Sequence, residues 1–163
     1  MDITIKTENY RFGCRTIGII LNKQKNKILI QKQTEKLYMI PGGRIEILEN
    51  SYDAIVREMK EELELVVSPS LKYVCESVNN IHDRYYHEIG FYYPIILEDK
   101  LLNKENDYIS NEKFTNKEGN NFLWVDINEL GKYNIIPKII TDRIKDKETL
   151  LNGVLEHIKY EEK

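Results

Sequence analysis

The sequence predicts an α/β fold in which helices cover a mixed β-sheet. Strand-like runs rich in Ile, Val and Tyr alternate with helix-like segments along the 163 residues. Several of the strands are joined by turns too short for a parallel crossover, so antiparallel pairs have to be present. A chain of this length buries about two-thirds of its unfolded surface. We therefore expect one domain over residues 1–163.

The first strands are predicted from short apolar runs. Residues Arg15–Leu21 and Lys27–Gln33 are separated by a short polar segment, which is typical of a hairpin. A third run, 37–40, ends at Pro41-Gly42-Gly43, where the chain must turn and where glycine allows backbone geometry that other residues resist.

A helix is predicted from Ser51 to Leu65, where the apolar residues take a helical period. Ser51 is the predicted N-cap, and Asp53 lies in the first turn, where an acidic group suits the helix dipole. At about 100° per residue, one arc of this helix is apolar and is predicted to be buried. Its members are Tyr52, Ile55, Val56, Met59 and Leu63.

The second half of the chain continues the alternation of strands and helices. The predicted elements are, in chain order, strands over 71–78, 85–97 and 122–125 and helices over 126–130 and 138–145. The polar stretch 98–121 is long for a connection, and such stretches are usually functional or disordered. The last stretch, 150–163, fits a helix or a strand equally well.

Three acidic residues of the predicted helix, Glu58, Glu61 and Glu62, adjoin its apolar arc. They share their own arc only with Ala54, whose small side chain leaves space in front of the carboxylates. Like charges three and four apart cost a helix roughly 0.2–0.5 kcal/mol per pair. Glutamate is a good helix former, and acidic surface helices are common, so an isolated pattern of this kind would need no further explanation. The alternative is a site for Mg²⁺ or Mn²⁺, which take oxygen ligands.

The context of these acids favours the metal site. The segment 43–65 resembles the Nudix box, in which a glycine is followed by five residues and a glutamate, then by seven residues and the pattern R-E-U-x-E-E-x-G-U, with U a bulky apolar residue. One position departs from this pattern, because Glu64 stands where the box has its last glycine. The segment Trp124–Leu130 is similar to a W-V-D-x-x-E-L segment found in many Nudix proteins. The family fold is an α/β/α sandwich with a mixed sheet between helices.

The resemblance implies roles for particular residues. In Nudix hydrolases the carboxylates matching Glu58, Glu61 and Glu62 bind divalent metal ions, and the backbone carbonyl matching Gly42 often completes the shell. The resemblance further implies that Glu49 pairs with Arg57 to brace the loop against the helix. Glu46 matches a position that is frequently acidic, and a contact to metal through water is a secondary expectation for it.

The reaction that the resemblance implies is hydrolysis of a nucleoside diphosphate linked to another group, with Mg²⁺ or Mn²⁺ as cofactor. The general base is Glu61 in some Nudix enzymes and a loop residue in others. Glu118, six residues before Trp124, is similar to the loop glutamate of the nucleoside-triphosphate branch. The competing interpretation of Glu118 is an exposed acid in a polar loop.

Other polar residues have both a functional and a structural interpretation. Arg15 lies on the first predicted strand, where a charge is costly unless it is paired, so it contacts either a substrate phosphate or a structural carboxylate. His82 and His87 flank a predicted strand. Histidine is a common general base, but we interpret both as hydrogen-bonded histidines of the sheet.

Composition limits the partners. Lys and Arg total 24 against 27 Asp and Glu, and this net charge of −3 argues against an electrostatic hold on nucleic acid or on an anionic membrane. Cys14 and Cys75 match no metal spacing, and no apolar run could serve as a signal segment or span a bilayer. We expect a soluble, cytoplasmic protein, for which a homodimer is left open because Nudix proteins are often dimers.

These observations predict a metal-dependent Nudix pyrophosphohydrolase acting on a small nucleotide-like diphosphate. Nucleoside triphosphates rank narrowly above ADP-ribose and nucleotide sugars as substrates, on the strength of the Glu118 segment alone. The alternative from another class is a Nudix-fold module that senses a nucleotide without cleaving it. This alternative is disfavoured because the box residues are intact at Arg57, Glu58, Glu61 and Glu62. The one feature in its favour is Glu64, which departs from the box.

Overall fold

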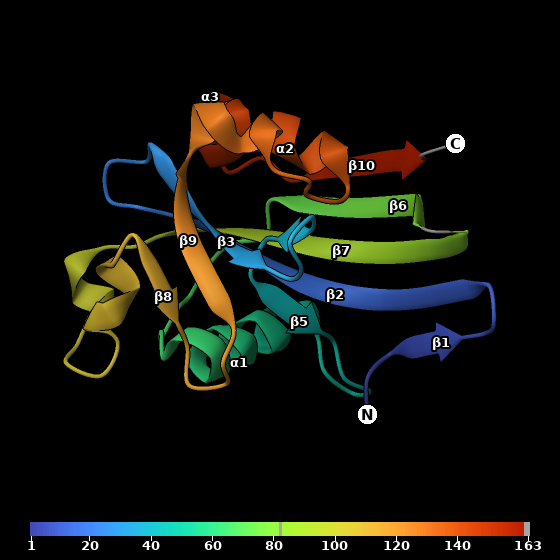
Figure 1. Cartoon of the computed structure of the whole chain (residues 1–163), viewed down its shortest axis with the longest axis horizontal. Helices are drawn as coiled ribbons and strands as arrows, with labels where there is room; N and C mark the ends of the chain where they lie inside the picture. The colour runs from blue at the N-terminus through green and yellow to red at the C-terminus, as the bar shows by residue number, and fades with distance from the viewer. Residues whose placement is uncertain (82, 162–163) are drawn as a thin grey trace.

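The strands of the computed structural model join into one mixed sheet, described over residues 1–81 and 83–161 (Figure 1). In chain order the strands of these residues are β1 (Thr4–Lys6), β2 (Tyr10–Leu21), β3 (Lys27–Lys32), β4 (Tyr38–Met39), β5 (Gly42–Arg44), β6 (Tyr73–Ile81), β7 (Arg84–Ile96), β8 (Lys113–Thr115), β9 (Asn121–Asp126) and β10 (Glu156–Glu161). Their order across the sheet is β10-β6-β7-β2-β3-β9-β8. The short strands β1 and β5 pair with β2, and β4 pairs with β3.

The sheet is mixed, as predicted. Strands β2 and β7 run parallel, from the pair Tyr10 and Tyr85 to the pair Leu21 and Ile96, and β10 runs parallel to β6. The other pairings of the named strands are antiparallel.

Helices cover both faces of the sheet. In chain order they are α1 (Ser51–Leu63), the 3₁₀ helices η1 (Asp99–Leu101), η2 (Asp107–Ser110) and η3 (Ile127–Lys132), and then α2 (Lys138–Lys145) and α3 (Lys147–Leu151). Figure 1 shows α1 on one side of the sheet and α2 and α3 on the other. The α/β/α sandwich is thereby confirmed. In the described part of the chain, no helix is long and apolar enough to cross a membrane.

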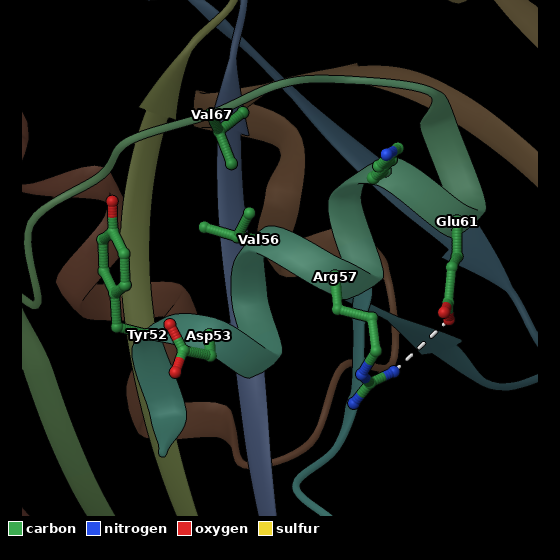
Figure 2. Close-up of a pocket in the computed structure, with 7 residues that line it drawn as sticks. Tyr52, Asp53, Val56, Arg57, Glu61 and Val67 are labelled. Atoms are coloured by element: carbon green, nitrogen blue, oxygen red, sulfur yellow. Dashed lines mark hydrogen bonds and ion pairs between the residues drawn. The ribbon is translucent and has the colours of Figure 1, made fainter. Parts of the chain in front are cut away.

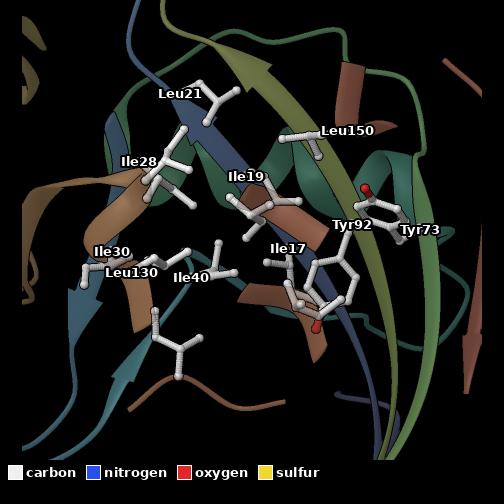
Figure 3. Close-up of a cluster of buried hydrophobic side chains, with 14 of the residues drawn as sticks. Ile17, Ile19, Leu21, Ile28, Ile30, Ile40, Tyr73, Tyr92, Leu130 and Leu150 are labelled. Carbon is white, nitrogen blue, oxygen red and sulfur yellow. The ribbon is translucent and has the colours of Figure 1, made fainter. Parts of the chain in front are cut away.

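The alternation of side chains along β2 divides the core between the two faces. Ile17, Ile19 and Leu21 point to the face of α2 and α3, where Figure 3 shows them packed together. Ile20 points to the opposite face, where it belongs to the same buried cluster as Met59 of α1. The central strand is therefore buried on both sides, which fixes its register.

The predicted strands are confirmed: β2, β6 and β9 are longer than predicted, β3 and β4 are shorter, and β7 is shifted by one residue. The open question at the C-terminus is resolved. The last stretch contains the end of α3 and then β10, so it is both a helix and a strand. The polar stretch 98–121 contains η1, η2 and β8. The helix predicted over 126–130 is the 3₁₀ helix η3, with Asp126 as its N-cap. Strands β1 and β5 were not predicted, because three residues carry no readable alternation.

The prediction of Ser51 as N-cap was wrong. Asn50 is the N-cap, because its backbone is extended and its side chain accepts a hydrogen bond of 2.9 Å from the Asp53 N–H. Ser51 is already helical, and its hydroxyl lies 2.7 Å from the hydroxyl of Tyr93. The helix ends at Leu63, two residues earlier than predicted.

The predicted buried stripe of α1 is partly confirmed. Ile55, Met59 and Leu63 are buried, and Val56 is half-buried. Tyr52 is 41% exposed, and its hydroxyl lies 3.0 Å from that of Ser68, so its inclusion was wrong. Ala54 is fully buried, and the arc of the acids is therefore tilted toward the sheet.

Candidate active site

Two glycines of β5 allow the backbone to approach β2 and α1. Gly42 has φ of 146°, and a Cβ atom there would lie 2.2 Å from the Thr16 carbonyl oxygen. A Cβ atom on Gly43 would lie 2.2 Å from the carboxyl carbon of Glu58. The Glu58 carboxylate thus occupies the space that any other side chain at position 43 would fill.

The loop after β5 is fastened to α1 by one ion pair. Arg57 donates from Nε to Glu49 Oε1 and from Nη2 to Glu49 Oε2, both at 2.8 Å. Its Nη2 also donates to the Arg44 carbonyl oxygen at 3.1 Å. The implied pairing of Glu49 with Arg57 is confirmed. It holds the loop against the first two turns of the helix that carries the acids.

The same arginine contacts two of the three predicted metal ligands. Its Nη1 donates to Glu58 Oε1 at 2.6 Å and lies 3.3 Å from Glu61 Oε2. The Glu58 side chain is 13% exposed, whereas that of Glu61 is 55% exposed. Figure 2 shows Glu61 on the outer side of α1, with its carboxylate directed to Arg57.

Glu62 is directed to the sheet and approaches β5. Its carboxylate accepts a hydrogen bond from the Gly42 N–H, while Oε2 is buried without a hydrogen-bond partner. Burial raises the pKa of the Glu62 carboxyl to about 7, and the charge of Glu58 acts in the same direction. Burial also raises the pKa of Glu58, against the effect of its hydrogen bond from Arg57. These are carboxylates that a cation would stabilise in the ionised form.

Arg15 lies beside these acids. Its Nη2 donates to the Gly42 carbonyl oxygen at 3.1 Å, its Nη1 lies 3.8 Å from the Met39 sulfur, and its Nε is buried without a partner. Its charge lowers the pKa values of Glu58 and Glu62. Arg15 therefore contacts the carbonyl that was predicted to bind metal, and its guanidinium retains a free donor.

A cavity of about 560 Å³ opens from this point along the strands, a size typical of ligand pockets. Arg15 and Glu62 line it at one end, and Asn79 and Tyr86 line it farther along β6 and β7. Among the described residues, seven buried side-chain N or O atoms lack a hydrogen-bond partner, and four of them belong to residues that line this cavity: Thr4, Arg15, Glu62 and Asn79. Unpaired buried polar groups are costly, and their concentration here indicates a ligand site.

A second hollow follows the outer face of α1, and Figure 2 draws the residues that line it. It has a volume of about 690 Å³ and lies between α1 and the segment that contains Val67. Its wall includes Arg57 and Glu61 but neither Glu58 nor Glu62. This hollow therefore lies on the outer side of the Arg57 ion pairs, and of the two cavities only the one on the sheet side is lined by Glu62.

Glu118 lies in the loop between β8 and β9 and is exposed. Its negative charge raises the pKa of Glu62, and the Asn116 side chain bonds both to the Glu62 carbonyl oxygen and to the Glu118 N–H. Glu46 is directed elsewhere, with its carboxylate 3.8 Å from the N-terminal amine. The ring of His87 is exposed and makes an edge contact with Phe12 at 5.2 Å. His82 lies outside the described residues.

Sequence reasoning missed several polar residues near the site. Asn79 and Glu88 come from strands that follow α1 in the chain, and they line the cavity. Asn116 contacts both α1 and the backbone of Glu118. No local pattern marks these residues, because each acquires its place through pairing with distant segments. A half-buried acid within a strand, such as Glu88, is the one signal that could have drawn attention.

The residues fit a divalent cation in part. Glu58 and Glu62 carboxylates and the Gly42 carbonyl are oxygen donors, and Glu62 Oε2 has no other partner. Among the described residues, no three His, Cys, Asp or Glu side chains are grouped closely enough to hold an ion. Glu58 and Glu61 are both directed to Arg57. The metal roles of Gly42, Glu58, Glu61 and Glu62 stay predictions.

Comparison with known proteins gives a family and a fold. The sequence model of the NUDIX domain matches residues 14–144. No curated protein matches the sequence. Three similar solved structures are 18–20% identical to the chain, and we describe them in turn. One, from work on MutT of Aliivibrio salmonicida and Vibrio cholerae, is 20% identical with a TM-score of 0.57, over 83% of this chain and 98% of its own.

The MutT protein of Bacillus halodurans is 18% identical with a TM-score of 0.61, over 91% of this chain and 89% of its own. A NUDIX-family hydrolase of Clostridium perfringens is 18% identical with a TM-score of 0.52, over 85% and 95%. Similarity at these identities supports the fold and leaves the activity to be argued from the site.

Proposed function

Because this chain belongs to the Nudix family, we propose that it is a metal-dependent pyrophosphohydrolase acting on a small nucleotide-like diphosphate. One observation carries the proposal. Glu62 and Arg15 line the same end of the cavity on the sheet, and each has a buried polar atom without a hydrogen-bond partner, so an acidic and a basic side chain border one ligand-sized space.

In this proposal Glu58, Glu61, Glu62 and the Gly42 carbonyl hold Mg²⁺ or Mn²⁺. When bound, the metal supplies positive charge to the diphosphate oxygens and lowers the pKa of bound water. Arg15 orients a phosphate through its free guanidinium donor. Arg57 holds Glu58 in place and keeps the loop of Glu49 against α1.

The reaction itself is an attack of water on phosphorus that breaks a bridging P–O bond. The attacked phosphorus keeps the water oxygen, and the other product leaves with the bridging oxygen, as phosphate or pyrophosphate from a nucleoside triphosphate or as one of two phosphate esters from a nucleotide sugar. The proton of the water passes to a carboxylate, for which Glu61 and Glu118 are the two candidates. The side chains of Glu61 and Glu118 are both exposed, so both satisfy the requirement that a base be free to approach the water.

Nucleoside triphosphates remain the first substrate class, as the Glu118 segment suggests. ADP-ribose or a nucleotide sugar is the second, and one observation favours it: the far part of the cavity presents hydrogen-bond acceptors, including the buried Asn79 Oδ1 and the half-buried Glu88. A sugar with several hydroxyl donors would pair with them. The net charge of −3 supports a free small molecule over nucleic acid or a membrane as the partner. The two cysteines, which match no metal spacing, support the cytoplasm as the setting of this activity.

A non-catalytic sensor is the competing proposal. The orientation of Glu58 and Glu61 toward Arg57 favours it, because an arginine that neutralises both acids would substitute for a cation. Calorimetry that detects nucleotide binding, together with chromatography that detects no product, would support the sensor.

The deciding experiment is a screen of nucleoside triphosphates, ADP-ribose and nucleotide sugars with Mg²⁺ or Mn²⁺, with products identified by mass spectrometry. We expect the E61Q variant to abolish the metal-dependent release of phosphate or pyrophosphate. E148Q, which changes an exposed acid of α3, is the matched control and should keep full activity. Undiminished turnover by E61Q would contradict the proposal.

A further inference from the structure

One buried asparagine joins the end of α1 to the loop of Glu118. Asn116 is 6% exposed, and its Nδ2 donates to the Glu62 carbonyl oxygen at 3.2 Å. Its Oδ1 accepts hydrogen bonds from the Glu118 N–H at 3.1 Å and from the Asn120 N–H at 2.9 Å. A single side chain therefore connects the backbone of Glu62 with the backbone of Glu118.

The loop closes on the same residue through its backbone. The Asn116 N–H donates to the Asn120 carbonyl at 3.0 Å, and the Gly119 N–H donates to the Asn116 carbonyl at 3.0 Å. Each polar group of the Asn116 side chain is thus used, and a buried amide that loses a partner is penalised. The position of Glu118 relative to α1 is consequently determined by Asn116.

A second tie runs beside the first. Lys117, the residue between Asn116 and Glu118, forms an ion pair with Glu64. Glu64 occupies the box position of the last glycine and has φ of 57°, a conformation that favours glycine. Its departure from the box therefore has a local explanation: the carboxylate reaches the loop that carries Glu118.

We propose that Asn116 is a positioning residue which, together with the Glu64–Lys117 ion pair, holds the loop of Glu118 against the end of α1. In this position the Glu118 carboxylate serves the divalent cation that Glu62 binds in the proposed function. The inference rests on the proposed function, because it assumes that Glu62 binds metal. It adds a residue that contacts neither metal nor substrate and acts through Glu118.

The chain contains a matched control for this role. Asn106 is fully buried, and its Nδ2 donates to the Glu64 carbonyl at 3.0 Å and to the Leu101 carbonyl at 3.1 Å. Its Oδ1 accepts from the Asn103 N–H at 2.6 Å. It joins the same end of α1 to a different loop, which has no part in the proposed site. Replacement of either asparagine should destabilise the fold. Only replacement of Asn116 should change the position of Glu118.

The test is titration with Mn²⁺ alone, followed by the electron paramagnetic resonance signal of the free ion. We expect E118Q and N116A each to weaken Mn²⁺ binding about tenfold or more, as loss of supporting groups around a metal usually does. The Mn²⁺ affinity of N106A should stay within about twofold of that of the wild type, although its urea midpoint should fall by about as much as that of N116A. N116A combined with E118Q should bind Mn²⁺ no more weakly than E118Q, because Asn116 acts through Glu118.

Equal effects of N116A and N106A, or additive losses in the double variant, would overturn the inference. If N116A does not fold, E64Q and K117M provide the milder test. Each should weaken Mn²⁺ binding about twofold, as expected for loss of one surface ion pair. In the E118Q background the same substitutions should not weaken Mn²⁺ binding further. Unchanged binding in these variants would count against the inference.

E62Q separates the two levels of proposal. If E62Q abolishes Mn²⁺ binding while E118Q and N116A do not change it, the proposed function stands and the inference falls. If E62Q also binds Mn²⁺ like the wild type, the metal site itself is wrong.

Discussion

The carboxylate of Glu49 and the guanidinium of Arg57 meet through two parallel hydrogen bonds, each 2.8 Å long. Both side chains are largely buried, at 16% and 26% exposure. The hydrogen bonds from Arg57 lower the pKa of Glu49, and the same contacts raise the pKa of Arg57. This geometry needs the planar fork of arginine, which lysine lacks.

Replacement of Arg57 by lysine should destabilise the fold by about 2 kcal/mol, because charge-assisted hydrogen bonds to Glu49 and Glu58 are lost. Urea denaturation measures this change. The control is R143K, which breaks an ion pair between Arg143 and Glu156 with a single contact of 2.7 Å and should cost about 1 kcal/mol or less. Equal losses for the two variants would contradict the bracing role of Arg57.

Replacement of Gly43 by alanine should displace the Glu58 carboxylate, whose carbon would lie 2.2 Å from the new Cβ atom. We expect a loss of about 1–3 kcal/mol, typical of overpacking, and a fall in Mn²⁺ affinity. The control is G131A, where the nearest atom to the new Cβ is the flexible Lys145 Nζ at 3.1 Å. A stable G43A protein with unchanged Mn²⁺ affinity would show that Glu58 is free to move.

Glu62 should make the metal-free protein less stable as the pH rises. Its carboxyl loses its proton near pH 4.5 when unfolded but only near pH 7 when folded. The folded state therefore holds the extra proton, and its stability falls between about pH 4.5 and pH 7. Urea midpoints at pH 5 and pH 8 without divalent ions should differ less in E62Q than in the wild type.

The same reasoning predicts the effect of metal. Mg²⁺ binds the ionised acids, so its addition at pH 8 should raise the urea midpoint of the wild type and leave that of E62Q unchanged. E129Q removes an exposed acid paired with Lys132 and should behave like the wild type in both experiments. If the urea midpoint of E62Q changed with pH as much as that of the wild type, a group other than Glu62 would be responsible for the change.

Replacement of Arg15 by lysine should lower kcat/KM about tenfold to a hundredfold, because a charged hydrogen bond to a phosphate is lost. R84K, at the start of β7 and outside the cavity lining, is the control and should keep kcat/KM. Steady-state assays on the substrate found in the screen measure both. Equal kcat/KM for R15K and the wild type would show that Arg15 has no role in substrate binding and serves only its structural hydrogen bond to the Gly42 carbonyl oxygen.

The sequence allowed prediction of those features that depend on local spacing. The helix of Glu58 and Glu62 and the strands with several apolar residues follow from patterns within about 20 residues. The contact of Glu49 with Arg57 was expected from the resemblance to the Nudix box. The directions of the acidic side chains at the edge of this helix could not be predicted from the sequence. Glu61 is turned outward to Arg57, and this depends on the loop that the helix packs against.

Features that depend on distant pairing could not be predicted. Asn79 and Asn116 are polar residues in strands or loops, and their sequence neighbours give no sign that they are buried. The three-residue strand β5 forms because β2 offers it a partner. The N-cap was missed by one position, since Asn50 and Ser51 are both good caps and only the backbone conformation decides between them.

The parallel ladder between β2 and β7 also determines when the protein can form during synthesis. Tyr10 pairs with Tyr85 and Leu21 pairs with Ile96, so β2 must wait for more than half of the chain to leave the ribosome. Until then, the backbone of β2 lacks the partner strand that takes up its hydrogen bonds. Such long-range pairing slows folding, and the nascent chain is therefore most prone to aggregate in the interval before β7 emerges.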